Sequence, residues 1–75
     1  MRINGLKQRL KSLKIDRDAY CLEGGLPDEA YTINQNMDTW EVYYSERGNK
    51  SGLKVFKTEN EACEFFLTEI IKMAQ

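Results

Sequence analysis

Apolar residues recur with a helical period at both ends of the chain and alternate with a period of two in between. This change of period restricts the fold more than any other feature of the sequence. Near the N-terminus the apolar residues follow one another at three- or four-residue intervals: Ile3, Leu6, Leu10 and Leu13. Residues 2–14 are therefore predicted to form an amphipathic helix. We expect it to begin at Asn4, acting as a cap, or one residue later.

Four short segments in the middle of the chain alternate apolar and polar side chains, as half-buried strands do. They cover residues 19–23, 30–35, 40–46 and 53–56. Gly24, Gly25 and Pro27 favour a turn after the first segment. Residues 47–52, with the sequence RGNKSG, are predicted to form a second turn between the last two strands.

The last segment is predicted to be a helix that begins after Thr58. Glu61 follows Thr58 by three residues, which is the spacing of a capping box at a helix N-terminus. The expected apolar stripe of this helix is wide enough to cover a sheet face. It consists of Ala62, Cys63, Phe66, Leu67, Ile70, Met73 and Ala74.

These elements predict a single α+β domain over residues 1–75, with the order helix, three- to four-stranded antiparallel sheet, helix. Parallel pairing is not expected, because the loops between strands are too short for a crossover. Both helices should pack on one face of the sheet and leave the other face open to water. The open face is expected to carry Cys21, Thr32, Asn34, Glu41, Tyr43, Lys54 and Phe56. A one-residue change of register would instead turn Phe56 into the core, against the last helix.

Two cysteines, Cys21 and Cys63, are interpreted as small core residues of a cytoplasmic protein with reduced thiols. A bridge between them is the alternative, and it would require export. No apolar run approaches the length of a membrane span, so no membrane association is expected. Nor does an apolar stretch typical of a secretory signal follow the N-terminal charge.

The composition argues against catalysis. The chain contains no histidine, which removes the commonest general base and every His-based triad. Gly24 and Gly25 precede Leu-Pro rather than a lysine and a helix, so they do not form a phosphate loop. Glu23, Asp28 and Glu29 lack the spacing of a calcium loop and are interpreted as solvated surface. No catalytic residue, metal ligand or cofactor is therefore assigned.

Charge is unevenly distributed along the chain. Residues 1–17 contain six basic residues and one acidic residue, whereas residues 18–75 contain five basic and eleven acidic residues. A nucleic-acid-binding or regulatory domain that uses Lys7, Lys11 and Lys14 is therefore the alternative function. It is disfavoured because double-stranded-RNA-binding domains of similar topology place basic residues at the start of the last helix. This chain has three glutamates there, in TENEACE.

Protein binding is the function that remains, because an exposed sheet face with aromatic and charged residues suits a protein partner. The candidate partner-binding residues are Glu41, Tyr43, Glu46, Arg47, Lys50 and Phe56. Trp40, Val42 and Tyr44 are assigned to the core. Oligomeric state is left open between a monomer and a homodimer formed through an edge strand.

Three stretches between residues 24 and 70 resemble small bacterial immunity proteins of polymorphic toxin systems. They are GGLPDEAYTI, WEVYYSERG and FKTENEACEFFLTEI. The resemblance implies a cytoplasmic, non-enzymatic protein that binds and neutralises a cognate toxin, often a nuclease. The acidic residues 18–75 would suit the basic cleft of a nuclease, whereas the basic first helix departs from that picture.

Overall fold

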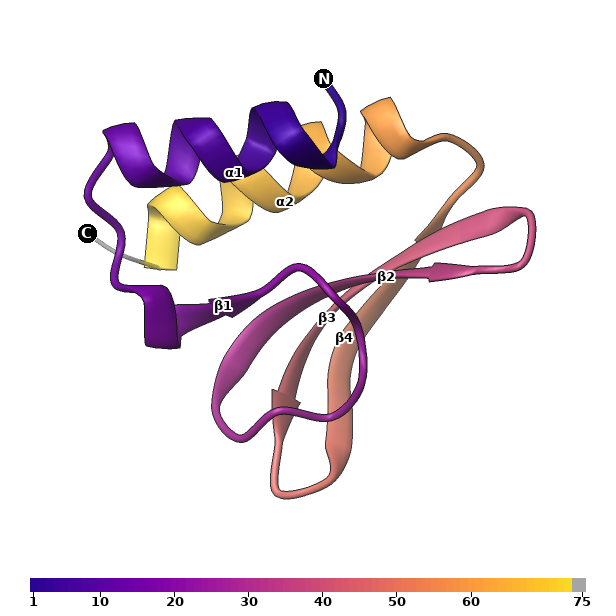
Figure 1. Cartoon of the computed structure of the whole chain (residues 1–75). Coiled ribbons are helices and arrows are strands. Elements are labelled where there is room, and N and C mark those ends of the chain that lie inside the picture. The colour runs from indigo at the N-terminus through magenta and orange to yellow at the C-terminus, as the bar shows by residue number, and fades with distance from the viewer. Residues whose placement is uncertain (74–75) are drawn as a thin grey trace.

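The computed structural model describes residues 1–73 as two helices and a four-stranded sheet. Helix α1 (Ile3–Ser12) is followed by a short 3-10 turn η1 (Arg17–Ala19) and strand β1 (Tyr20–Cys21). Strands β2 (Ala30–Asn36), β3 (Thr39–Glu46) and β4 (Asn49–Phe56) lead into helix α2 (Glu59–Met73). The predicted α+β class and the order helix, sheet, helix are confirmed (Figure 1).

The sheet has the strand order β1-β2-β3-β4, with β1 and β4 at its two edges. Strands β2, β3 and β4 pair antiparallel, as predicted. The expectation that no strands pair in parallel is wrong for β1, which lies parallel to β2 through Tyr20↔Tyr31 and Cys21↔Thr32. The argument against a crossover assumed full-length strands. Strand β1 has only two residues, so the loop formed by residues 22–29 is long enough to bring the chain back to the level where β1 begins, and β2 can then run parallel to it.

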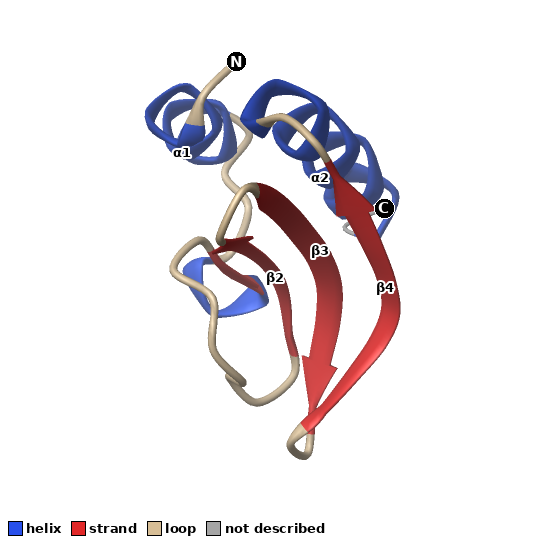
Figure 2. Ribbon diagram, turned by 90° about the vertical axis from the view of Figure 1, so that its right-hand side faces the viewer, coloured by secondary structure: helices blue, strands red, loops and turns tan. Residues whose placement is uncertain are grey.

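Both helices lie on one side of the sheet, side by side, with α1 toward the β2 side and α2 toward β4 (Figure 2). Helix α2 contacts β2, β3 and β4, and α1 packs against α2. The side chains that this arrangement buries form one core: Leu6, Leu10, Tyr31, Ile33, Val42, Ala62, Cys63, Phe66, Leu67 and Ile70. The Tyr31 and Phe66 rings meet at 4.9 Å between centroids. The predicted stripes on the two helices therefore supply most of this core.

Helix α1 differs from its predicted form at both ends. It begins after Arg2, so Asn4 lies inside the helix. At the other end Lys14 has a φ of 57°, and the Ile15 N–H donates to the Leu10 carbonyl at 3.2 Å. These are features of a Schellman motif, which normally has glycine at the left-handed position. The reversal turns Leu13 to solvent and brings Ile15 against the core in its place.

Strand β4 is longer than predicted, and its pairing with β3 is shifted by one residue after a bulge. The turn before it consists of Arg47 and Gly48 alone, with φ values of 51° and 79°. The pairing with β3 then skips one residue around Gly52, whose φ is 63°, which makes a β-bulge. Because of this bulge, Phe56 pairs with Trp40 on the helix-facing side, and its ring lies 5.2 Å from that of Phe65. The assignment of Phe56 to the open face is wrong, and the alternative register is correct.

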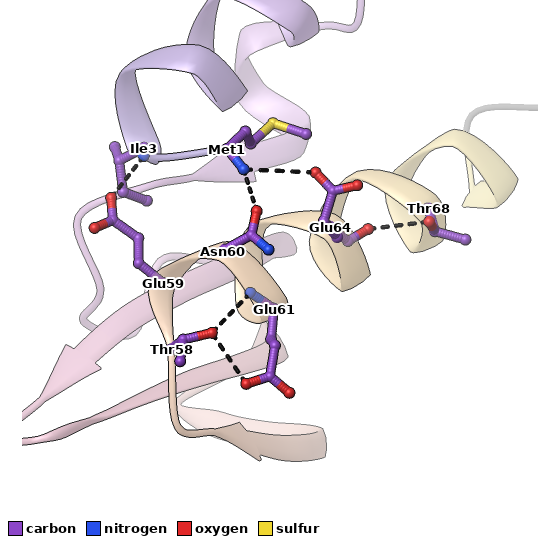
Figure 3. A network of polar contacts seen from close by, with 8 residues as sticks. All are labelled: Met1, Ile3, Thr58, Glu59, Asn60, Glu61, Glu64 and Thr68. Atoms are coloured by element: carbon purple, nitrogen blue, oxygen red, sulfur yellow. Dashed lines mark hydrogen bonds and ion pairs between the residues drawn. The ribbon is translucent and has the colours of Figure 1, made fainter.

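Helix α2 is capped as predicted at its N-terminus. The Thr58 hydroxyl accepts a hydrogen bond from the Glu61 N–H at 3.1 Å and donates to the Glu61 carboxylate at 3.0 Å (Figure 3). At the other end Met73 is exposed rather than part of the apolar stripe. Ala74, also assigned to that stripe, lies outside the described residues.

Polar side chains at the N-terminus of helix α2 also bind the N-terminus of helix α1 (Figure 3). The Glu59 carboxylate accepts from the Ile3 N–H at 2.8 Å. The Met1 ammonium donates to Asn60 and lies 3.8 Å from the Glu64 carboxylate. Helix α1 has no side-chain cap from its own N-cap residue, so α2 supplies the carboxylate that its first turn lacks.

Neither helix in residues 1–73 combines the length and the apolar character that crossing a bilayer would require.

Candidate functional site

The sheet face that was expected to be open is partly covered by the loop formed by residues 22–29. Tyr43 is fully buried there, with an exposed fraction of 0%, and its hydroxyl donates to the Gly25 carbonyl at 2.6 Å. Thr32 and Ser45, on the same face, are also fully buried. Tyr43 therefore cannot contact a partner in this conformation, and its predicted exposure is wrong.

Gly24 brings the covering loop into direct contact with β2. A Cβ atom at this position would lie 2.1 Å from Oδ1 of Asn34, and the Gly24 φ of 75° disfavours any other residue. The Cys21 thiol also donates to the Gly24 carbonyl, at 3.4 Å. Gly24 thus serves close packing of the loop on the sheet, whereas the sequence had indicated only a turn.

Glu41 lies at the border of the covered region and is also nearly buried, with 9% of its surface exposed. Its two carboxylate oxygens accept from the side-chain amides of Asn34 and Asn36, each at 3.4 Å. Lys50 approaches the same carboxylate at 3.5 Å and lies 4.8 Å above the centre of the Tyr43 ring. Glu41 is therefore satisfied within the protein, so its assignment as an exposed contact residue is also wrong.

Burial affects the ionisation of two groups in or beside the core. The pKa of the Tyr43 hydroxyl is raised, chiefly by desolvation and further by the Glu41 and Cys21 charges. Burial raises the pKa of the Cys63 thiol from 9.0 to about 11, with Glu59 adding to the shift. Both cysteines are free. Because burial keeps the Cys63 thiol neutral, Cys63 is a core side chain rather than a nucleophile.

The remaining candidate residues lie together on the β3–β4 hairpin, whose turn is far from the helices (Figure 1). Glu46, Arg47 and Lys50 are all exposed there. The structure adds two exposed apolar residues of β4: Leu53, 44% exposed, and Val55, 58% exposed. We call these five residues the hairpin margin. The alternation of Leu53 and Val55 with Lys54 and Phe56, which were expected on the open face, had implied that both apolar residues point toward the helices. Side chains of residues 53–56 do alternate between the two sheet faces, but the bulge at Gly52 exchanges the faces, so Val55 points away from the helices and Phe56 toward them.

The alternative site on α1 is partly assembled. Lys7 and Lys11 line a groove of about 550 Å³ between α1 and β1, together with Arg17 from η1. Lys14 does not line this groove, because it occupies the left-handed position after the helix. Ile3, Tyr20 and Leu22 supply apolar surface to the groove.

Comparison of the chain with protein-family models, with curated proteins and with solved structures finds no match.

Proposed function

We propose that this chain is a non-enzymatic protein-binding domain that neutralises a bacterial toxin by binding it through the hairpin margin. The observation that carries the proposal is the exposure of Leu53 and Val55 on an edge strand. Exposed apolar side chains that lie together within a rim of charged residues are typical of protein contact sites.

The rim of this surface is mixed in charge. Glu46 and Arg47 stand at the turn, and Lys50 follows on β4. Arginine and an apolar centre favour a stable protein contact, whereas alternating charges select among partners. Lys50 is already oriented by its contacts with Glu41 and Tyr43, so less side-chain entropy is lost when a partner binds it.

The contact is expected to use side chains rather than backbone pairing along β4. Lysines at positions 50 and 54 and the bulge at Gly52 are devices that discourage the addition of another strand to an edge. Val55 pairs with Glu41 and therefore lies on the sheet face away from the helices, on the part of that face that the covering loop leaves exposed. A partner would dock beside this loop, across the outer half of β3 and β4.

The toxin-neutralising role rests on the resemblance of residues 24–70 to immunity proteins. Two residues of the hairpin margin, Glu46 and Arg47, belong to the three stretches that carry this resemblance, whereas the basic helix α1 lies outside them. In this proposal the chain acts in the cytoplasm and catalyses no reaction. The runner-up is nucleic-acid binding through α1, which the cation-lined groove favours.

Growth rescue tests the proposed function. The product of the neighbouring gene is expressed in bacteria with and without this chain, and cell growth is measured. The proposal predicts growth arrest that this chain relieves, and a stable complex of the two proteins on gel filtration. A neighbouring product that neither binds this chain nor is inhibited by it would contradict the toxin-neutralising role.

A paired charge reversal maps the surface in the same assay. Glu46→Lys combined with Arg47→Glu keeps the net charge and lies in an exposed turn, so folding should be unaffected. This variant should weaken the complex about tenfold or more. Glu69→Lys combined with Lys72→Glu, which swaps an ion pair on α2 away from the hairpin, is a control of equal charge change.

A further inference from the structure

We propose that the groove between α1 and β1 binds an extended acidic segment of a partner protein. It lies at the opposite edge of the sheet from the hairpin margin, since β1 and β4 are the two edge strands. The inference rests on the proposed function only in taking the partner to be a protein. It concerns a separate surface.

The charges of the groove are not neutralised by the rest of the protein. Lys7 and Lys11 are one helical turn apart on α1, and Arg17 lies across from them on η1. Among residues 1–73 the ion pairs involve Met1, Lys50 and Lys72, and none involves these three cations. Glu23 is the one acidic residue of the described chain that lines the groove. The site therefore attracts negative charge.

The groove runs along the outer edge of β1. Successive side chains of a strand point to opposite faces of a sheet, and both Tyr20 and Cys21 line the groove. A cavity that touches both must border the strand edge rather than one face. The edge of β1 that faces away from β2 belongs to no other strand of the described sheet. An extended peptide can use the backbone groups of such an edge.

The groove also has an apolar part and a suitable size. Ile3, Tyr20 and Leu22 are partly buried and pack against the core, so they form a fixed floor. The volume of about 550 Å³ lies in the range of binding pockets for small ligands and accommodates a few residues of peptide. The occupant that fits is a segment that alternates acidic and apolar side chains.

A nucleic acid fits less well. Arg17 is flanked in the sequence by the exposed residues Asp16 and Asp18, and Glu23 lines the groove itself. A continuous phosphate backbone that passed the groove would meet these carboxylates, whereas separate acidic side chains reach the cations one at a time. The lysines at the edge likewise repel a basic strand but attract an acidic one.

Fluorescence anisotropy with a labelled octapeptide of alternating Glu and Val tests the proposal on the full chain. We expect saturable binding that weakens when salt rises from about 50 mM to about 300 mM. Lys7→Glu combined with Lys11→Glu should weaken it about tenfold or more. Lys54→Glu combined with Lys57→Glu, at the opposite edge of the sheet, is the matched control and should retain binding. An octapeptide of alternating Glu and Gly should bind more weakly, because it lacks apolar side chains.

Absence of peptide binding would overturn the proposal, as would equal loss in the groove and control variants, which indicates unspecific attraction. Tighter binding of a single-stranded oligothymidylate than of the peptide would also overturn it, in favour of a nucleic-acid site. Amide chemical shifts give a readout of location: the peptide should perturb residues 3–11 and 20–23. Val55→Asp should leave peptide binding unchanged, so failure of this site and failure of the hairpin margin are distinguishable.

Discussion

The hydroxyl of Tyr43 and the carbonyl oxygen of Gly25 are joined by a hydrogen bond of 2.6 Å. This bond fixes the loop of residues 22–29 over the centre of the sheet, on the side that faces away from the helices. It leaves the outer part of β4 as the accessible portion of that side. The position of a partner surface thus depends on how this loop is held.

Replacing Tyr43 by phenylalanine removes the hydrogen bond and keeps the buried ring. Tyr43→Phe should lower the free energy of unfolding by about 1 kcal/mol, the usual net contribution of such a bond. Urea unfolding followed by circular dichroism measures the change. Tyr44→Phe on the helix-facing side is the control and should change stability by less than about 0.5 kcal/mol. Equal stability of Tyr43→Phe and the wild type would show that the hydroxyl does not hold the loop.

The two neighbouring glycines of the loop should differ in their tolerance of alanine. Gly24→Ala forces a methyl group against Asn34, and we expect a loss of about 2–4 kcal/mol. Gly25→Ala meets no atom within 4 Å, so it should cost about 1 kcal/mol from backbone strain alone. Thermal unfolding of the two variants compares them directly. The close approach of loop and sheet would be refuted if both lost the same stability.

Lys14 occupies a left-handed position at the end of α1, where glycine is favoured. Lys14→Gly should therefore raise the free energy of unfolding by about 0.5–1 kcal/mol. Lys11→Gly removes the same charge inside the helix and should lower it by about 1 kcal/mol. Chemical denaturation should therefore show that the free energy of unfolding rises in Lys14→Gly and falls in Lys11→Gly. A loss of stability in both variants would contradict the described helix end.

Alkaline pH should destabilise the fold through Cys63. Its pKa is 9.0 when unfolded and about 11 when buried, so the unfolded state releases the proton first. The contribution is complete below pH 9 and is lost as pH rises to about 11, by on the order of 2 kcal/mol. Cys63→Ala should show a smaller decrease in stability between pH 8 and pH 10.5. Identical pH dependence in the variant and the wild type would exclude the thiol as the cause.

The sequence was sufficient to predict the elements that depend on local signals. The stripe of α2 and its cap at Thr58 follow from spacing alone, and the alternation in β3 assigned Val42 correctly to the core. These segments agree with the structure because each residue's preference and the tertiary packing favour the same arrangement.

The candidate surface was harder to predict because it depends on two non-local features. Tyr43 is covered by a loop whose contact residue, Gly25, lies 18 positions earlier in the chain. The alternation of side chains in β3 contains no information about this contact. The direction of Val55 and Phe56 depends on one extra residue at a bulge, which inverts every later side chain of β4. The glycine at position 52 is the signal in the sequence that could have indicated the bulge, since glycine within a strand often marks one.

The affinity of this chain for the product of its neighbouring gene, measured by calorimetry with Val55→Asp and with the wild type, tests the central claim most directly. The claim predicts a wild-type complex that Val55→Asp weakens about a hundredfold, since a charge then lies at the centre of the contact, while Lys57→Glu leaves it unchanged. Unchanged affinity in a folded Val55→Asp variant would contradict binding through the hairpin margin.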